Sequence, residues 1–110
     1  MKEKDKPTDN IKELANQQRR ANRLNSIRNG IDGGTIKEWN QIFAIVTETR
    51  MSIELGMAFN TLRKKVTDPG EFTINEIIRL AALFGVKYDV MADWIRDRIK
   101  AKSKSRIFRE

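Results

Sequence analysis

Three side chains with base-recognition chemistry lie close together in one short segment, Phe59, Asn60 and Arg63. On an α-helix this spacing places them on one side, opposite Leu62 and Val66. Asparagine can make two hydrogen bonds to adenine, arginine can do the same with guanine, and an aromatic ring can touch a thymine methyl group. The segment therefore carries side chains suited to the major groove of duplex DNA.

Basic and polar residues around this segment are candidates for contacts with the DNA backbone, because phosphate contacts need charge more than shape. The candidates are Arg50, Lys64, Lys65, Thr67, Lys100, Lys102 and Lys104. The alternative interpretation is that Asn60, Arg63 and Lys64 form an ordinary solvated helix face. Phe59 could equally tuck into the domain.

The net charge of +7 is unevenly distributed along the 110 residues. Residues 1–34 carry a net charge of +3, residues 35–95 carry −1, and residues 96–110 carry +5. The segment with the candidate base contacts is therefore almost neutral, and the excess positive charge lies in the flanks. Such flanks either attract phosphates without regard to sequence or simply keep a small domain soluble.

The residue types that the chain lacks argue against catalysis. There is no cysteine and no histidine, which excludes disulfides, thiolate metal sites and the commonest general base. No nucleophile–base pair or glycine-rich phosphate loop stands out. We expect neither an enzyme nor a cofactor. The charged N-terminus and the lack of a long apolar run predict no signal peptide, no membrane span and a cytoplasmic location.

The apolar periodicity throughout is helical, and no strand pattern occurs. Residues 10–28 are expected to form a helix with Asn10 as its cap and Asn29-Gly30 as its stop. Its apolar stripe is thin, so this helix packs on something, pairs with a copy of itself, or stays partly disordered. Residues 31–34 read as a linker or turn.

Capping patterns divide the rest of the chain into helices. Thr35 followed by Glu38, and Thr73 followed by Glu76, have the spacing of capping boxes. The expected helices are one opened by Thr35 and carrying Trp39, Ile42, Phe43 and Val46, then 48–55 ended by Gly56, 59–66, one from Thr73 to Gly85, and 88–100. Residues 101–110 are expected to fray.

Two further details of these helices are predicted. Residues 67–70 should form a type II turn with Gly70 at positive φ. The helix after Thr73 should bury its apolar residues, which are Ile74, Ile77, Ile78, Leu80, Ala81 and Phe84.

The last helix carries a broad apolar stripe. Its members are Val90, Met91, Trp94 and Ile95. The stripe is wider than a short terminal helix needs to close a small bundle, so part of it could be a homodimer surface. The alternative is that at least half of these side chains are core.

The chain resembles the Cro- and lambda-repressor-like helix-turn-helix family from about Thr47 to Val86, and the resemblance extends more weakly over 36–97. The resemblance rests on Thr47 opening a bracing helix, Met51-Ser52 in its leucine and alanine places, Gly56 at the turn, Leu62, Thr73-Ile74, Leu80-Ala81 and Gly85-Val86. It implies an all-α bundle of about five helices, here with an extra N-terminal helix or arm. It also implies duplex DNA binding, usually as a dimer.

The sequence departs from the family at Ala58, which stands where a serine usually caps the recognition helix. The loss of a capping side chain costs about 1 kcal/mol. We expect residues 1–34 to form a polar arm and linker, 35–97 the helix-turn-helix domain and 98–110 a basic tail. The expected function is sequence-specific DNA binding by a bacterial or phage transcriptional regulator or mobile-element protein. The rival is a protein-interaction module, such as an antitoxin or assembly domain.

Overall fold

A computed structural model describes the backbone of residues 7–109 and the side chains of residues 11–101. Within this range there are α-helices and one 3-10 turn, and no strand. The elements are α1 (Pro7–Gly33), α2 (Trp39–Phe43), α3 (Glu48–Leu55), α4 (Phe59–Thr67), η2 (Pro69–Glu71), α5 (Ile74–Phe84) and α6 (Tyr88–Arg109). The prediction of a small all-α bundle with an additional N-terminal helix is confirmed.

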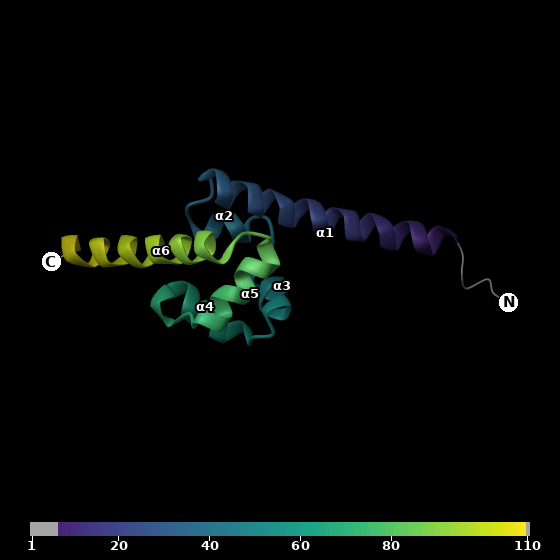
Figure 1. Cartoon of the computed structure of the whole chain (residues 1–110). Coiled ribbons are helices and arrows are strands. Elements are labelled where there is room, and N and C mark those ends of the chain that lie inside the picture. The colour runs from purple at the N-terminus through teal and green to yellow at the C-terminus, as the bar shows by residue number, and fades with distance from the viewer. Residues whose placement is uncertain (1–6, 110) are drawn as a thin grey trace.

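The short helices α2 to α5 gather around the end of α1 and the beginning of α6, and the two long helices project from this globule in opposite directions (Figure 1). The projecting half of α1 makes little contact with the rest of the protein. Ile11 and Leu14 on it are 64% and 63% exposed. No helix in the described part of the chain combines the length and the apolar character that a membrane crossing requires.

One hydrophobic core joins all the helices. Its largest fully buried side chains are Ile27, Ile42, Met51, Leu62, Leu80, Phe84 and Met91. The rings of Trp39 and Trp94 are nearly perpendicular, with ring centroids 4.8 Å apart. The indole N–H of Trp94 also donates to the backbone oxygen of Ile36 at 2.7 Å, so this buried polar group is satisfied.

The end of α1 lies several residues beyond its predicted stop. The helix runs through Asn29-Gly30 to Gly33, and Gly34 takes the left-handed conformation with φ +79. Gly30 is buried, and a Cβ built on it would lie 2.5 Å from the side chain of Ile36. Gly30 therefore permits a close approach between α1 and the chain that follows, and it does not end the helix. Its neighbour Ile31, predicted in a linker, is a core residue.

The N-terminal end of α1 also differs from the prediction. The helix begins at Pro7, so Asn10 lies inside it. Proline suits a first helical position because its fixed φ matches the helix and it has no N–H to satisfy.

The predicted ends of α3 and α5 are confirmed. The Thr47 hydroxyl accepts a hydrogen bond from the N–H of Arg50 at 3.2 Å, which caps α3. Thr73 and Glu76 form the expected capping box at the start of α5. Gly56 and Gly85 end the two helices with φ values of +67 and +73.

Two other local predictions are wrong. The cap of α2 is Glu38 and not Thr35, because the Gln41 side chain reaches back to accept from the N–H of Glu38 at 2.9 Å. Gly70 does not adopt positive φ, since residues 69–71 form a 3-10 turn instead of a type II turn.

The apolar residues of α5 are not all buried. Ile74 and Ile78 are 66% and 48% exposed, contrary to the prediction, whereas Leu80, Ala81 and Phe84 are in the core. Ile74 and Ile78 are four residues apart, so they occupy one face of the helix, and the neighbouring elements do not cover that face.

The apolar stripe of α6 belongs to the protein's own core. Met91, Trp94 and Ile95 are buried, and Val90 is half-buried. The homodimer surface predicted from this stripe is therefore not exposed. The stripe is wide because the beginning of α6 is covered by α1 as well as by α5 and η2. The helix itself continues to Arg109, beyond the fraying predicted after residue 100.

Candidate nucleic-acid interface

Helix α4 presents the predicted polar face to the outside. Leu62 is fully buried and Val66 is half-buried, so the opposite side of the helix faces away from the core. Asn60, Arg63 and Lys64 are exposed on it. The helix is held by its turn from α3 and by the packing of Leu62. Ala58, at its start, contributes no capping hydrogen bond.

Phe59 lies at the rim of this face, with 37% of its surface exposed. The guanidinium carbon of Arg63 lies 5.8 Å from the centre of the Phe59 ring. Such a cation–π contact at an exposed site contributes about 0.5–1 kcal/mol. It holds the arginine toward the N-terminal end of α4, where a groove-binding helix makes its base contacts.

Lys65 is occupied by contacts within the protein. Its ammonium group lies 2.9 Å from a carboxylate oxygen of Glu76 and donates to the backbone oxygen of Glu71 at 3.1 Å. Both charged side chains are more than four-fifths buried. Lys65 therefore ties α4 to α5 and is not free for the phosphate contact predicted from the sequence.

The same contacts alter the acidity of Glu76. Partial burial acts to raise its pKa, but hydrogen bonds from the N–H of Thr73 and from Lys65 outweigh the burial. The net result is a pKa below the ordinary value for glutamate. The ionised form of Glu76 thus stabilises the fold, and this contribution is lost as the pH falls through the lowered pKa.

We expect Glu76→Gln to lower the free energy of unfolding by about 0.5–1.5 kcal/mol at pH 7, because glutamine keeps the capping hydrogen bond but loses the charge opposite Lys65. The difference from the wild type should shrink as the pH falls through the lowered pKa of Glu76, because the carboxyl group then becomes protonated. Urea unfolding curves at several pH values measure it. In a Lys65→Met background the same substitution should have a smaller effect at pH 7. A difference independent of pH would contradict the assignment.

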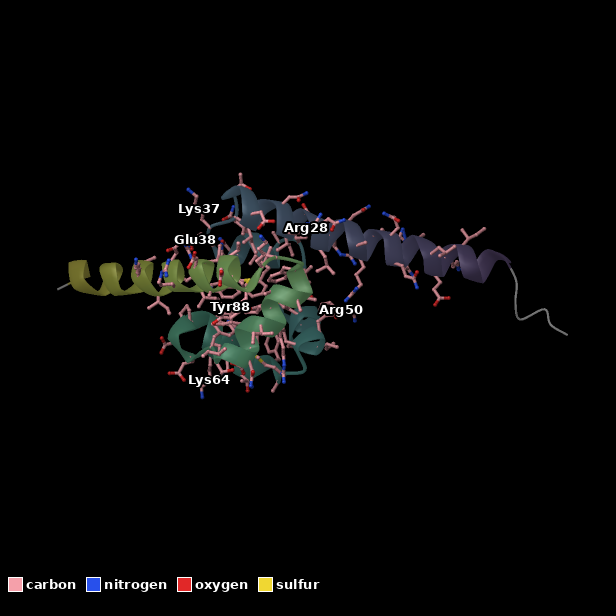
Figure 2. All side chains as sticks on the ribbon, viewed as in Figure 1. Arg28, Lys37, Glu38, Arg50, Lys64 and Tyr88 are labelled. Carbon is pink, nitrogen blue, oxygen red and sulfur yellow. The ribbon has the colours of Figure 1, made fainter. Side chains whose placement is uncertain are left out.

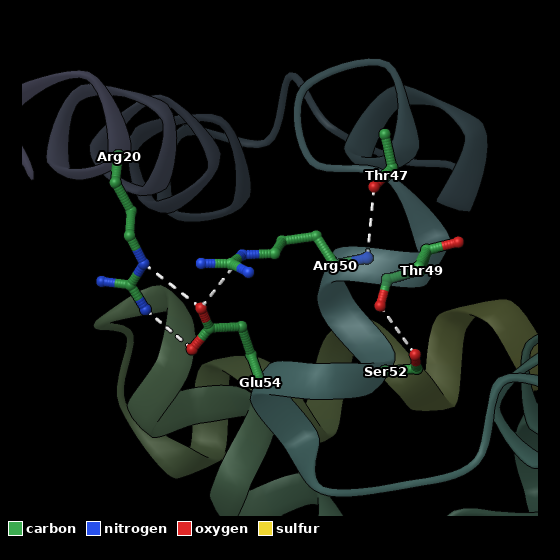
Figure 3. Close-up of polar contacts among 6 residues, drawn as sticks. All are labelled: Arg20, Thr47, Thr49, Arg50, Ser52 and Glu54. Carbon is green, nitrogen blue, oxygen red and sulfur yellow. Dashed lines mark hydrogen bonds and ion pairs between the residues drawn. The ribbon is translucent and has the colours of Figure 1, made fainter. Parts of the chain in front are cut away.

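Arg50 belongs to a second group of charged residues, between α1 and α3 (Figure 3). The carboxylate of Glu54 accepts hydrogen bonds from Nε and Nη2 of Arg20, at 3.2 and 2.7 Å. One of its oxygens also lies 3.5 Å from Nε of Arg50. Two arginines thus share one carboxylate and leave a net positive charge. We call Arg20, Arg50 and Glu54 the α1–α3 cluster.

The α1–α3 cluster lines a hollow of about 390 Å³ that Arg23 also borders, with Leu24, Ile45, Val46 and Leu83 as its apolar part. The cap of α3, Thr47, lies at the same hollow. Arg20 and Arg23 were not identified from the sequence. Both lie in α1, which we predicted from the sequence to be a separate arm. Only the packing of α1 against the globule brings them close to α3.

The basic residues predicted to touch phosphates thus fall into separate groups. Figure 2 shows Lys64 at the far side of the globule from Arg28 and Lys37, with Arg50 beside α1. Lys100 and Thr67 are exposed. Lys102 and Lys104 lie outside the residues whose side chains the structure describes. Lys64 borders a hollow after α4 together with the acidic residues Asp68 and Glu71.

Comparison of the chain with protein-family models, curated proteins and solved structures gave no match.

Proposed function

We propose that this protein binds duplex DNA by inserting α4 into the major groove, with Asn60 and Arg63 contacting bases and Phe59 touching them at the rim. The observation that carries the proposal is the exposed face of α4, where asparagine, arginine and lysine stand together on a helix fixed by a fully buried Leu62. A rigid helix that offers hydrogen-bonding side chains on one face meets the geometric requirement for reading base edges.

The turn before α4 supports the same function. Helix α3 packs against α4, and Gly56 at positive φ allows a short connection between them. Ser52, in α3, is 4% exposed, and its hydroxyl donates to the backbone oxygen of Thr49 at 2.7 Å. A small residue with its hydroxyl satisfied inside its own helix lets the two helices cross closely, as a helix-turn-helix needs.

Positive side chains in separate groups would hold the phosphates. Lys64 is the nearest candidate, and Arg50 with Arg20 in the α1–α3 cluster is a second, beside α3. Lys100, Lys102 and Lys104 would add affinity that does not depend on sequence. With the resemblance described above, this favours a transcriptional regulator or a mobile-element DNA-binding protein of a bacterium or phage.

Arg63→Ala is expected to weaken binding to a preferred duplex by about 1–3 kcal/mol and to relax the preference at one base pair. Lys64→Ala should weaken all duplexes alike and lower the slope of log K against log salt by about 0.9. Selection of preferred duplexes from a random pool, followed by titrations at two salt concentrations, measures both effects.

Arg28→Ala is the matched control, because Arg28 is exposed on the side of the globule opposite Lys64 (Figure 2). It should leave the base preference and the affinity nearly unchanged. If Arg63→Ala binds the selected duplex and random DNA as tightly as the wild type does, α4 is not the reading helix.

The second candidate function is protein interaction, favoured by the exposed Ile74 and Ile78 on α5 and by the pairing of Lys65 within the protein. Unselective duplex binding by the wild type, unchanged by Arg63→Ala, would favour this alternative. Antitoxin and assembly domains are examples of such modules.

A further inference from the structure

The hollow that the α1–α3 cluster borders has an apolar part held in place by the fold. Its volume of about 390 Å³ lies at the lower end of the range for small-molecule sites, roughly 300–1,000 Å³. The apolar part is contributed by α1, by the loop between α2 and α3, and by α5. Its members are Leu24, Ile45, Val46 and Leu83. All four belong to the hydrophobic core or pack against it, so the hollow has a fixed apolar lining.

The charged part of the hollow is strongly positive. Arg20, Arg23 and Arg50 border it, and Glu54 is the one carboxylate among its described lining residues. Figure 3 shows the guanidinium groups of Arg20 and Arg50 approaching Glu54 from α1 and α3. No acidic side chain within residues 11–101 forms an ion pair with Arg23. The hollow therefore holds more positive charge than its own carboxylate can neutralise.

The polar groups at the hollow are accessible to a ligand. The side chains of Arg20 and Arg50 are 45% and 58% exposed, and ion pairs this exposed contribute little to stability. An incoming anion can therefore replace Glu54 as the partner of Arg50 at a small cost. The Thr47 hydroxyl accepts from the N–H of Arg50 at 3.2 Å, and its own O–H can still donate into the hollow.

We propose that this hollow binds a small organic acid, with its carboxylate at Arg23 and Arg50 and its apolar body over Leu24, Ile45 and Leu83. Guanidinium groups suit a carboxylate because their donors match its two oxygens. An inorganic anion would leave the apolar lining uncovered, and a neutral apolar molecule would leave the arginines without a partner. A ligand that is both apolar and anionic uses both parts of the hollow.

The inference goes beyond DNA binding and does not rest on it. Helix α4 does not border the hollow. A DNA phosphate at the α1–α3 cluster would be held by charge alone, and it would not cover the apolar lining. Ligand binding is measured without DNA, so either proposal can fail while the other stands.

Three probes separate the two parts of the hollow. Isothermal titration of the full chain compares 2-naphthoate, which has both a charged head and an apolar body, with acetate and 2-naphthamide, which each have one of them. We expect 2-naphthoate to bind about tenfold or more tightly than either of the others. Its binding should weaken as salt is added, because salt screens the arginines.

Substitutions at the charged residues have effects of opposite sign. Arg23→Gln and Arg50→Gln should each weaken 2-naphthoate binding about tenfold, because each removes a positive charge that faces the carboxylate. Glu54→Gln should tighten it about threefold or more, because it removes the competing negative charge and keeps an acceptor for Arg20. A purely structural role for Glu54 would not produce this gain. Circular dichroism checks that each variant is folded.

Arg19→Gln is the matched control. Arg19 is an exposed arginine on the same helix, donates to Asn16 at 2.8 Å and lies outside the hollow. Its substitution should leave the binding of 2-naphthoate unchanged. Amide NMR spectra locate the ligand, since shifts are expected at Val46 and Thr47 and not at Lys64 on α4.

Four outcomes would overturn the inference. The first is that 2-naphthoate shows no saturable binding up to about 10 mM, and the second is that 2-naphthamide binds equally well. The third is that Arg23→Gln and Arg50→Gln bind 2-naphthoate like the wild type. The fourth is that the amide shifts spread over the exposed basic residues of the chain instead of clustering at the hollow.

Discussion

Leu62→Ala is expected to lower the free energy of unfolding by about 2–5 kcal/mol. Leu62 is fully buried, and it is the residue of α4 that packs in the hydrophobic core. Its truncation removes apolar contacts and leaves a cavity that the short helices around it can fill only in part. Chemical denaturation followed by circular dichroism measures the loss.

Ile78→Ala is the matched control for Leu62→Ala. It also removes a large aliphatic side chain from a short helix, but Ile78 is 48% exposed. Its cost should stay within about 0.5 kcal/mol, because alanine is the better helix former and little burial is lost. Equal costs for the two substitutions would contradict the assigned packing of α4. Arg63→Ala should not destabilise the fold, so an effect of Leu62→Ala on DNA binding reports unfolding and not lost base contacts.

Alanine substitutions at two glycines of α1 are expected to have opposite signs. Gly33→Ala should stabilise the protein by up to about 1 kcal/mol, because alanine favours the helix and a Cβ at this position meets nothing within 4 Å. Gly30→Ala should destabilise it by about 1–3 kcal/mol, because its Cβ would lie 2.5 Å from the buried side chain of Ile36.

The thermal unfolding of these variants distinguishes the steric effect from the helix propensity. In an Ile36→Ala background the atoms nearest to the new Cβ are gone, so Gly30→Ala should there become neutral or stabilising. A stabilising Gly30→Ala in the wild-type background would mean that α1 and the following chain do not approach as closely as described.

Elements whose ends depend on local chemistry were predicted well from the sequence. Thr47 and Gly56 set the bounds of α3, and Thr73 and Gly85 those of α5, because capping hydrogen bonds and left-handed glycines act within a few residues. The burial of Leu62 and the outward face of α4 follow from helical spacing in the same way.

Features that depend on contacts between distant segments were missed. The composition around Gly30 reads as a helix stop, and only Ile36 packing against it explains a glycine inside the helix. In the sequence nothing distinguishes Lys65 from an exposed lysine. Its ion pair forms only because the fold places Glu76, at the start of α5, next to it. The α1–α3 cluster joins residues 34 positions apart, a pairing that no local pattern indicates.

Helix α1 runs without a break from solvent into the core. We therefore expect a steep gradient of amide hydrogen exchange along it. Around Ile11 and Leu14 the helix has no packing to break, so its amides should exchange through fraying with little protection. Around Ile27, which is fully buried, exchange requires the opening of the whole core. The protection should rise between these ends near Arg20, where the ion pair with Glu54 first fastens the helix to the globule.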